Sequence, residues 1–569
     1  MIEKMTGFSF IMLKDGSDAF LNRLKELGVV DITRSAKAVD EVSLRLATEI
    51  SSTKKRISEL NAGKDSRLEE LVARQKELEK ELGETEPWGD FDRKKLEGLG
   101  LPVRFFCTGR KRFNPEWKEE YPLVIAEETE KSVYYVIVGD AADFPEKDIP
   151  APARKLSEIR ADIEENRLET ENYRKELERC KADIPALEKK AEDIAGELEL
   201  HLAKAGGEEA AESHLTVYEG FAPEKDETEL CEELDRMDII YLKYKATAED
   251  NPPIEFRNNR FVKLFEPLTD MYGRPSYDGF DPTPYISVFF LLFFAMCMGD
   301  AGYGIILVIG GLLLGKVRSF ASLAPLVTVL GIGTVIVGFF FHTFFSIDIS
   351  SWEWIPESIR GMMVPSKVAG YDGTMVLGRI LGIIHLCLAI IVKTVYATRN
   401  KGFLNSLGVW GWTLLIVGGV VTGGVWLTGV LDSATVKVII MVLGAVSAIG
   451  IFFLNDLHGN PLKNVGSGLW EAYNTATGLL GDVLSYLRLY ALGLAGGMLG
   501  YAFNDLAEMA LGDGGFRWVF FILIVIIGHT LNLAMAALGA FVHPLRLNFL
   551  EFFKNSGYEG SGRRYKPIK

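Results

Sequence analysis

Residues 285–315 read YISVFFLLFFAMCMGDAGYGIILVIGGLLLG and contain a single charged residue, Asp300. About 20 apolar residues are needed to cross a bilayer as a helix. The run therefore forms either one long helix or two short helices that fold back at the central Gly299–Gly304 segment. The choice decides on which side of the membrane every later loop lies.

Six further apolar runs are long enough to span a bilayer: residues 321–345, 375–398, 407–430, 434–454, 478–502 and 516–541. If the first run folds back, the loops with Lys316 and Lys401 and the basic C-terminal tail fall on the side of the N-terminal half. That arrangement obeys the positive-inside rule, and the opposite loops are predominantly acidic. We therefore predict a membrane domain, 285–569, with eight helices and both termini in the cytoplasm.

The charge is distributed unevenly along the 569 residues. Residues 1–284 carry 44 Lys and Arg against 63 Asp and Glu, whereas the remainder carries 18 against 14. This asymmetry excludes a purely soluble enzyme, and the acidic front half argues against a nucleic-acid partner, because phosphate binding needs a basic face. The first apolar run, residues 8–13, is too short for a secretory signal. We expect a multi-pass protein of the cell membrane whose front half stays in the cytoplasm.

Two segments of the front half, about 41–85 and 155–205, repeat apolar residues at alternating three- and four-residue steps. This spacing is typical of a coiled coil, here with a break near Gly63 and a kink at Pro185. The two arms are predicted to pair antiparallel. A self-contained helical hairpin without a wider function is the alternative reading.

Short segments with mixed strand and helix patterns flank the arms, and we predict two small α+β lobes from them. The lobe near the membrane comprises 1–40 and 206–250, and the distal lobe comprises about 86–150. Together with the arms they form the cytoplasmic domain, 1–284. The predicted fold is mainly α: a cytoplasmic antiparallel coiled-coil dumbbell with two lobes, followed by a polytopic helical membrane domain of eight segments.

The sequence offers no catalytic, cofactor or metal site. The five cysteines form no C-x-x-C pair, so neither a disulfide framework nor a zinc site is indicated. Residues 310–317, GGLLLGKV, match the first seven positions of a phosphate-binding loop but have Val317 where a Ser or Thr must reach magnesium. We predict that ATP does not bind there.

Arg488 is the most informative charge within a predicted span. It lies in residues 485–495, SYLRLYALGLA, and a central charge costs roughly 2.5 to 3.5 kcal/mol on insertion scales. Since an arginine stays protonated, it supplies a fixed positive charge that could displace an ion from a passing carboxylate. The small residues Ala491, Ala495 and Ala502 share its helical face. The alternative is a structural ion pair, with Asp482 as a possible partner.

The last span carries a stripe of polar and small residues at three- and four-residue steps. An ion-facing seam has this pattern, although a membrane histidine is often hydrogen-bonded and inert, and an arginine near a helix end can snorkel. His342, His385 and Lys393 belong to no such stripe and are interpreted as structural. The stripe consists of His529, Asn532, Ala536, Gly539, His543 and Arg546.

Three separated blocks resemble subunit a, also called subunit I, of A-type and V-type rotary ATPases, in the archaeal or bacterial form. The first comprises 251–253 (NPP), 269–277 (TDMYGRPSY), 281–284 (DPTP) and 299–304 (GDAGYG). The second is 485–495, and the third is 543–549 (HPLRLNF) with 551–553 (EFF). The resemblance implies a stator that holds two offset ion half-channels against a rotating proteolipid c/K ring. It implies that Arg488 is the family's essential arginine and that Arg546 is the second one.

The resemblance also implies partners. Peripheral-stalk coiled-coil subunits would dock on the dumbbell, a central-stalk socket subunit and membrane lipids would be neighbours, and the ATP site would lie on partner subunits. Proton and sodium stay open as the ion, as does the direction of ATP turnover. Ala536 stands where some relatives place a membrane carboxylate. Candidate half-channel residues are therefore Asp482, Asp505, Glu508, His529, Asn532, His543 and Glu551.

A secondary transporter or membrane receptor with a coiled-coil arm is the alternative from another class. An inverted repeat between the membrane halves would favour a transporter, and the sequence shows none.

Overall fold

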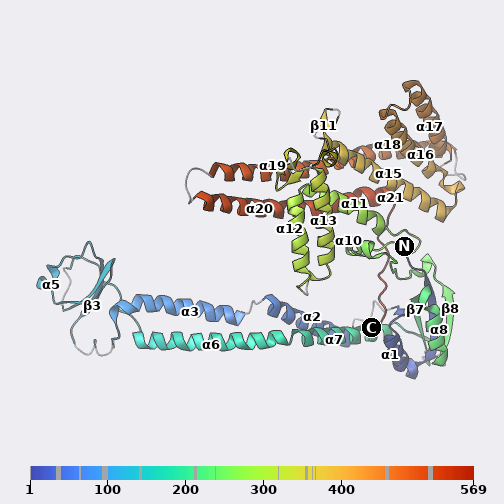
Figure 1. The fold of residues 1–569 in the computed structure, drawn as a ribbon. Coiled ribbons are helices and arrows are strands. Elements are labelled where there is room, and N and C mark those ends of the chain that lie inside the picture. The colour runs from blue at the N-terminus through green and yellow to red at the C-terminus, as the bar shows by residue number, and fades with distance from the viewer. Residues whose placement is uncertain are drawn as a thin grey trace. The chain divides into compact units, whose positions relative to one another are not determined.

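The computed structural model describes residues 2–33, 40–62, 66–91, 96, 100–139, 144–210, 214–237, 239–317, 320–352, 356–361, 363–365, 367–368, 370–454, 461–510 and 517–568. The chain is mainly helical and divides into two compact units (Figure 1). Unit 1 comprises Met1–Gly16, Leu24–Thr33 and Glu208–Pro567, and unit 2 comprises Ser17–Arg23, Arg34–Gly207 and Ile568–Lys569. The predicted break near Gly63 and parts of the predicted lobes (34–39, 92–95, 97–99, 140–143 and 211–213) lie outside the described residues.

Four helices of unit 2 pack in pairs: α2 (Glu41–Ala62) on α7 (Ile184–Lys204), and α3 (Ser66–Thr85) on α6 (Leu156–Ala182). This order along the chain makes the pairs antiparallel. Leu71 and Ile159 are among the buried seam residues. The seam also holds Asn166, whose Nδ2 donates to the Leu71 carbonyl at 3.1 Å and to Gln75 Oε1 at 2.9 Å. A buried polar residue that is hydrogen-bonded in this way favours one register of the pair. A new helix begins at Ile184, just before Pro185.

A three-stranded antiparallel sheet lies between α3 and α6 in the sequence and belongs to unit 2. Its strands are β3 (Val103–Gly109), β4 (Leu123–Glu128) and β5 (Ser132–Val138), in the order β3-β5-β4. Alternate residues of β5 are buried with Phe106 and Phe144, and Thr108 Oγ1 lies 2.8 Å from the Tyr135 hydroxyl.

The sheet of unit 1 joins chain segments that are far apart in the sequence. The strand order is β2 (Asp31–Ile32), β7 (Leu215–Pro223), β1 (Met5–Leu13), β8 (Ile240–Lys245), with β6 (Glu208–Ala210) on β7. β1 pairs with β7 from Met5↔Pro223 to Leu13↔Leu215. Helix α8 (Glu227–Arg236) follows β7, and Thr6 Oγ1 donates to Glu227 Oε2 at 2.9 Å.

Within the described part of the chain, five helices are long and apolar enough to cross a membrane. This is compatible with a multi-pass membrane protein. Three of them are Gly373–Lys401 (α15), Leu404–Leu427 (mainly α16, Leu407–Leu427) and Ser433–Phe453 (α17). The fourth, Asn464–Ala510, consists of α18 (Pro461–Ser485) and α19 (Leu487–Ala510). The fifth, Trp518–Ser556, consists of α20 (Arg517–Arg546), a π-helix (Leu547–Phe552) and α21 (Phe553–Ser556). Three shorter apolar helices precede them: α11 (Thr283–Met298), α12 (Ala301–Leu314) and α13 (Ala324–Phe340).

Residues 285–315 form two helices, as predicted. Gly299 adopts a left-handed conformation (φ 58°) that ends α11, and Asp300 caps the N-terminus of α12. The second helix packs mainly along α13 and not along α11 (Figure 1).

Two helical stretches, Asn464–Ala510 and Trp518–Ser556, extend beyond the predicted spans 478–502 and 516–541. The helical stretch Asn464–Ala510 has 47 residues, and at about 1.5 Å per residue it exceeds the roughly 30 Å hydrocarbon core about twofold. Such a stretch must be broken or strongly tilted, and a break separates α18 from α19 at Tyr486. Figure 1 shows α19 and α20 side by side.

The C-terminal tail connects the end of the membrane helices to the sheet of unit 1. The Gly562 N–H donates to the Arg274 carbonyl, and the Ile254 N–H donates to the Arg563 carbonyl at 2.8 Å. Farther along, the Lys566 N–H donates to Asp31 Oδ2 at 2.9 Å, beside β2. The tail therefore ties the lobe of unit 1 to its helices by backbone hydrogen bonds.

Candidate functional site

Arg488 lies in the first turn of α19, two residues after the break at Tyr486. Its side chain is half-buried. Among the residues that the structure describes, Arg488 has no ion-pair partner, and its Nη1 is buried without a hydrogen-bond acceptor. An unpaired guanidinium among apolar helices is costly unless water or a charge from another chain compensates it.

The ion pair between Arg488 and Asp482 that the sequence left open is wrong. Asp482 Oδ2 accepts a hydrogen bond from Asn555 Nδ2 at 2.8 Å, and its Oδ1 lies 3.7 Å from Lys554 Nζ. Both partners belong to α21, at the end of the last membrane stretch. The carboxylate of Asp482 is thus already compensated without Arg488.

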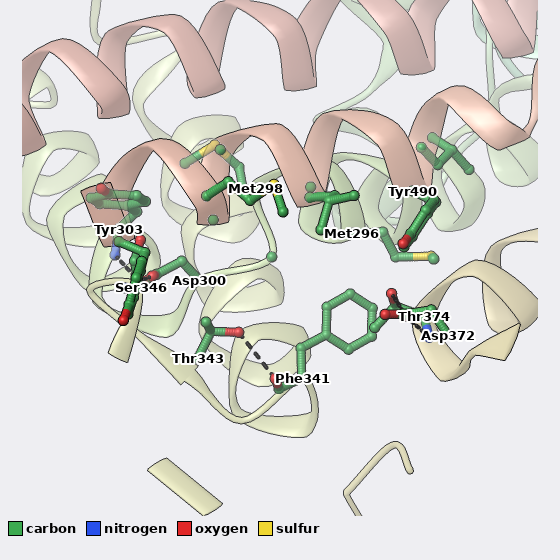
Figure 2. A pocket seen from close by; sticks show the side chains of 18 residues that line it. Met296, Met298, Asp300, Tyr303, Phe341, Thr343, Ser346, Asp372, Thr374 and Tyr490 are labelled. Carbon is green, nitrogen blue, oxygen red and sulfur yellow. Dashed lines mark hydrogen bonds between the residues drawn. The ribbon is translucent and has the colours of Figure 1, made fainter. Parts of the chain in front are cut away.

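A cavity of about 510 Å³ lies among the α11–α12 turn, the β9 strand (Thr343–Phe344), the start of α15 and helix α19. Figure 2 shows polar side chains at its two ends with Met296 and Met298 between them. One end holds Asp300, Tyr303 and Ser346, and the other holds Asp372, Thr374 and Tyr490.

A second cavity, of about 240 Å³, lies among α15, α16, α18 and α21. Its lining is more polar in character and includes Lys393, which the sequence analysis interpreted as structural. The other polar lining residues are Glu471, Asn474, Thr475, Lys554 and Asn555.

The two cavities use different parts of the α18–α19 stretch. The second is lined by α18 residues between 471 and 479, and the first by α19 residues between 489 and 501. Arg488 lines neither cavity and lies between these two segments in the chain. A fixed positive charge therefore stands, in the sequence of this helical stretch, between the residues that line the two cavities.

Asp300 organises the polar end of the first cavity. Its carboxylate accepts four backbone N–H groups: Gly302 and Tyr303 in the first turn of α12, and Phe345 and Ser346 in the turn between β9 and β10 (Ile347–Asp348). Asp300 is 4 % exposed, so these bonds satisfy a buried charge and fix the loop after α13 against α12.

A directed chain of hydrogen bonds begins beside this carboxylate. Asn532 Nδ2 donates to the Tyr303 hydroxyl at 2.8 Å, and that hydroxyl lies 2.8 Å from His529 Nδ1. His529 Nε2 lies 2.9 Å from Asn504 Oδ1, and Asn504 Nδ2 donates to the Phe345 carbonyl at 2.9 Å. The donors fix one direction, in which Tyr303 donates to Nδ1 and a neutral His529 keeps its proton on Nε2. Because Asn504 Oδ1 can only accept, the imidazole link cannot reverse while the amide donates to the Phe345 carbonyl.

The structure brings only some of the predicted residues together. His529 and Asn532 both belong to the hydrogen-bond chain through Tyr303, and His543 on α20 interacts electrostatically with Arg488. Glu551 is 3 % exposed on the π-helix, near Ser485 and Asp482. Asp505 and Glu508 are exposed on α19 and line neither cavity, and Arg546 is exposed at the end of α20.

Sequence reasoning missed Asp300, Tyr303 and Asn504. Asp300 and Tyr303 stand in the GDAGYG motif, where the polar residues within an apolar run were the available signal. Asn504 gave no local signal, because its partners come from α20 and the β9–β10 turn.

Comparison with known proteins identifies the family to which this chain is related. Residues 153–356 match the V-type ATPase 116kDa subunit family. The chain is 30 % identical to A-type ATP synthase subunit I of Methanocaldococcus jannaschii, over 95 % of this chain and 83 % of that one. The chain belongs to the subunit I family of A-type and V-type ATPases. The resemblance noted in the sequence is thereby confirmed.

Other relatives carry the same subunit name. V-type ATP synthase subunit I 1 of Treponema pallidum is 27 % identical over 88 % of this chain and 84 % of that one. Among solved structures, the cytoplasmic N-terminal domain of subunit I, homolog of subunit a, of V-ATPase is 18 % identical, covers 42 % of this chain and 100 % of that chain, and has a TM-score of 0.16. As a member of the subunit I family, the chain is a non-catalytic membrane subunit of a rotary ATPase.

Proposed function

We propose that this chain is the membrane stator that carries ions past a proteolipid c/K ring and couples proton or sodium translocation to ATP synthesis or hydrolysis on partner subunits. The observation that carries the proposal is Arg488, a permanent cation without an ion-pair partner in the described chain, which lies in the α18–α19 stretch between the segments that line the two cavities. A ring carboxylate is the counter-charge that such an arginine would accept. Pairing with it would expel the bound ion, since the guanidinium does not deprotonate.

The two cavities serve as the offset half-channels of this proposal. The first would conduct through the side chains gathered around Asp300 and Tyr303, and the second through those around Glu471 and Asn474. Because Arg488 stands between them, an ion could pass from one to the other only on the ring. His529 and Asn532 would act on the first path through their hydrogen bonds to Tyr303, and Asp482 on the second through Asn555.

The face of α19 around Arg488 supports a close approach by another helix. Ala491, Ala495 and Ala502 are exposed on that face. Small side chains let helix backbones come together in a membrane, where packing drives association. The ring helices would slide along this surface.

In the same proposal all eight apolar helices lie in the membrane, both termini are cytoplasmic, and the cytoplasmic part forms the dumbbell. Its coiled-coil arms and lobes would anchor the peripheral stalks, with the central-stalk socket subunit as a further partner. The transporter and receptor alternatives gain no support from the family relationship.

The test uses the intact complex purified from native membranes through a tag on this chain and reconstituted into vesicles. ATP-driven ion uptake and ATP hydrolysis are measured for wild type, Arg488→Ala and Arg379→Ala, the last a matched control because Arg379 is an exposed arginine on α15. We expect Arg488→Ala to assemble and to lose uptake, with Arg379→Ala close to wild type. Uptake that persists in Arg488→Ala would refute the gate, and loss of assembly would make Arg488 a structural residue.

A further inference from the structure

We propose that Tyr486 and His385 are positioning residues that hold Arg488 in place between the two cavities. The inference rests on the proposed function of Arg488. It concerns a histidine that the sequence gave no reason to single out, and it follows from the way three separate chain segments clamp the break between α18 and α19.

Tyr486 forms the break itself. Its N–H donates to the Val483 carbonyl at 3.3 Å, and its own carbonyl accepts from the Leu489 N–H at 3.2 Å. Both bonds span three residues, which is tighter than an α-helical turn and changes the phase of the helix. The direction in which Arg488 leaves α19 therefore depends on the conformation at Tyr486, two residues earlier.

The side chain of Tyr486 is fixed by α15. It is 1 % exposed, and its hydroxyl lies 2.9 Å from His385 Nδ1. Its ring lies against Gly382, where a Cβ would be 2.4 Å from the Tyr486 Cγ. The ring thus fits only because position 382 has no side chain, and the hydroxyl fixes how far the ring enters.

His385 is held as firmly as its tyrosine partner. It is fully buried and stacks between Phe289 of α11, at 4.2 Å, and Phe552 of the π-helix, at 4.8 Å with the ring planes 7° apart. Phe293 contacts both His385 and Tyr486 edge-on. The imidazole can neither tilt nor rotate without unpacking α11 and the π-helix. Through its hydrogen bond to His385, the Tyr486 side chain is therefore fixed to the core of the membrane helices.

Displacement of Arg488 has a consequence different from simple destabilisation. If the guanidinium shifts along α19, the two cavities are no longer separated, and ions can cross between them without rotation of the ring. A positioning defect would therefore raise the passive ion leak and lower the number of ions moved per ATP. A merely structural role would reduce assembly and leave the stoichiometry of assembled complexes unchanged.

The experiment uses the reconstituted complex with Tyr486→Phe, His385→Leu and His385→Asn, and with Tyr473→Phe as control. Tyr473 lies on α18, is 63 % exposed and lines neither cavity. Asparagine places an amide group where Nδ1 stands and can pair with the hydroxyl. Uptake, ATP hydrolysis and passive leak under an imposed potential are measured at equal amounts of assembled complex.

We expect Tyr486→Phe and His385→Leu to lower ions moved per ATP roughly five-fold, the factor that corresponds to losing one buried hydrogen bond, and to raise the leak. His385→Asn should recover most of the loss, and Tyr473→Phe should match wild type. If His385→Leu fails to assemble, Tyr486→Phe decides, since it removes one oxygen only. Wild-type stoichiometry and leak in Tyr486→Phe overturn the proposal.

Arg488→Ala measured in parallel separates the two ideas. If Arg488→Ala pumps normally, the proposed function itself falls. If Arg488→Ala fails to pump and Tyr486→Phe is normal, only the positioning role falls.

Discussion

Gly304 of α12 lies so close to Val335 of α13 that a Cβ at Gly304 would be 2.6 Å from the Val335 backbone nitrogen. The contact is reciprocal along the pair, since a Cβ at Gly331 of α13 would be 2.7 Å from the Val308 nitrogen of α12. Backbone contact of this kind maximises van der Waals packing between helices in a membrane. It explains why α12 turns to α13 and not to α11.

The first prediction tests this contact. Gly304→Ala should destabilise the α12–α13 pair by about 1–3 kcal/mol, because backbone atoms cannot yield to the new methyl group as a side chain would. Gly310→Ala is the matched control on the same helix, since nothing lies within 4 Å of its Cβ position. The measurement is the thermal unfolding of the detergent-purified protein. Equal midpoints for the two variants would show that the helices separate easily at this point.

The second prediction concerns Asp300, which accepts four backbone N–H groups. Asp300→Ala leaves these N–H groups unpaired, at a cost of about 1–3 kcal/mol of stability for each group. We therefore expect the Asp300→Ala protein not to accumulate in the membrane. Asp300→Asn should be milder, because Oδ1 accepts three of the four bonds and only the Ser346 N–H depends on Oδ2. Quantitative immunoblots of membranes compare the two. Equal levels of both variants and wild type would contradict the role of the carboxylate.

The third prediction is a pH dependence at the start of α2, in the coiled-coil unit. The Ser43 backbone N–H donates to Asp40 Oδ1 at 2.8 Å, and His201 Nε2 lies 2.7 Å from Oδ2. Hydrogen bonds from the Ser43 backbone, then from its side chain, then from His201, lower the pKa of Asp40 from 3.8 to about 2. A lowered pKa stabilises the folded state above the unfolded pKa, and this stabilisation is lost as the pH falls from about 4 towards 2.

The expected result is that Asp40→Ala speeds hydrogen exchange in the first turn of α2 at pH 6, and that the difference from wild type shrinks as the pH is lowered below 4. Asp40→Asn keeps the capping oxygen without a titrating charge, so its exchange relative to Asp40→Ala should not change over that range. A wild-type advantage that persists undiminished near pH 2 would contradict the assignment.

The elements that sequence could predict are those with a local signal. The α2–α3 and α6–α7 arms carry a repeat of three and four residues, and α11, α12, α13, α15, α16 and α17 coincide with continuous apolar runs, so the sequence predicts both groups of helices. The helical stretch Asn464–Ala510 extends beyond the predicted span because Glu471 and Asn474, which line the second cavity, lower the hydropathy of its first part. Polar residues that belong to a site thus shorten the apparent span.

The sequence predicts only those residues of the site that form a local pattern. His529 and Asn532 share one face of one helix, and their spacing is visible in the sequence. Their partner Tyr303 is more than 200 residues away, and the pairing depends on how α12 packs. His385 had no pattern at all, because its role follows from two aromatic rings that reach it from other helices.

The fourth prediction separates the two membrane arginines. Arg546 ends α20 with its side chain exposed, whereas Arg488 is half-buried and its Nη1 has no acceptor in the described chain. An exposed arginine near a helix end can extend its head group toward water and loses little when shortened to lysine. We therefore expect almost normal ion uptake in Arg546→Lys. In Arg546→Ala, uptake should fall about two- to three-fold, a factor that corresponds to the energy of an exposed ion pair.

In contrast, ATP-driven ion uptake should fall more than about ten-fold in Arg488→Lys. A lysine can lose its proton in an apolar site and cannot present the planar fork of a guanidinium to a carboxylate. ATP-driven uptake in reconstituted vesicles, normalised to assembled complex, gives the comparison. Nearly normal uptake in Arg488→Lys would mean that any cation suffices at this position. A loss in Arg546→Ala as deep as in Arg488→Ala would place both arginines on the path of the ion, and the exposure of Arg546 would then mark a surface that the ring covers.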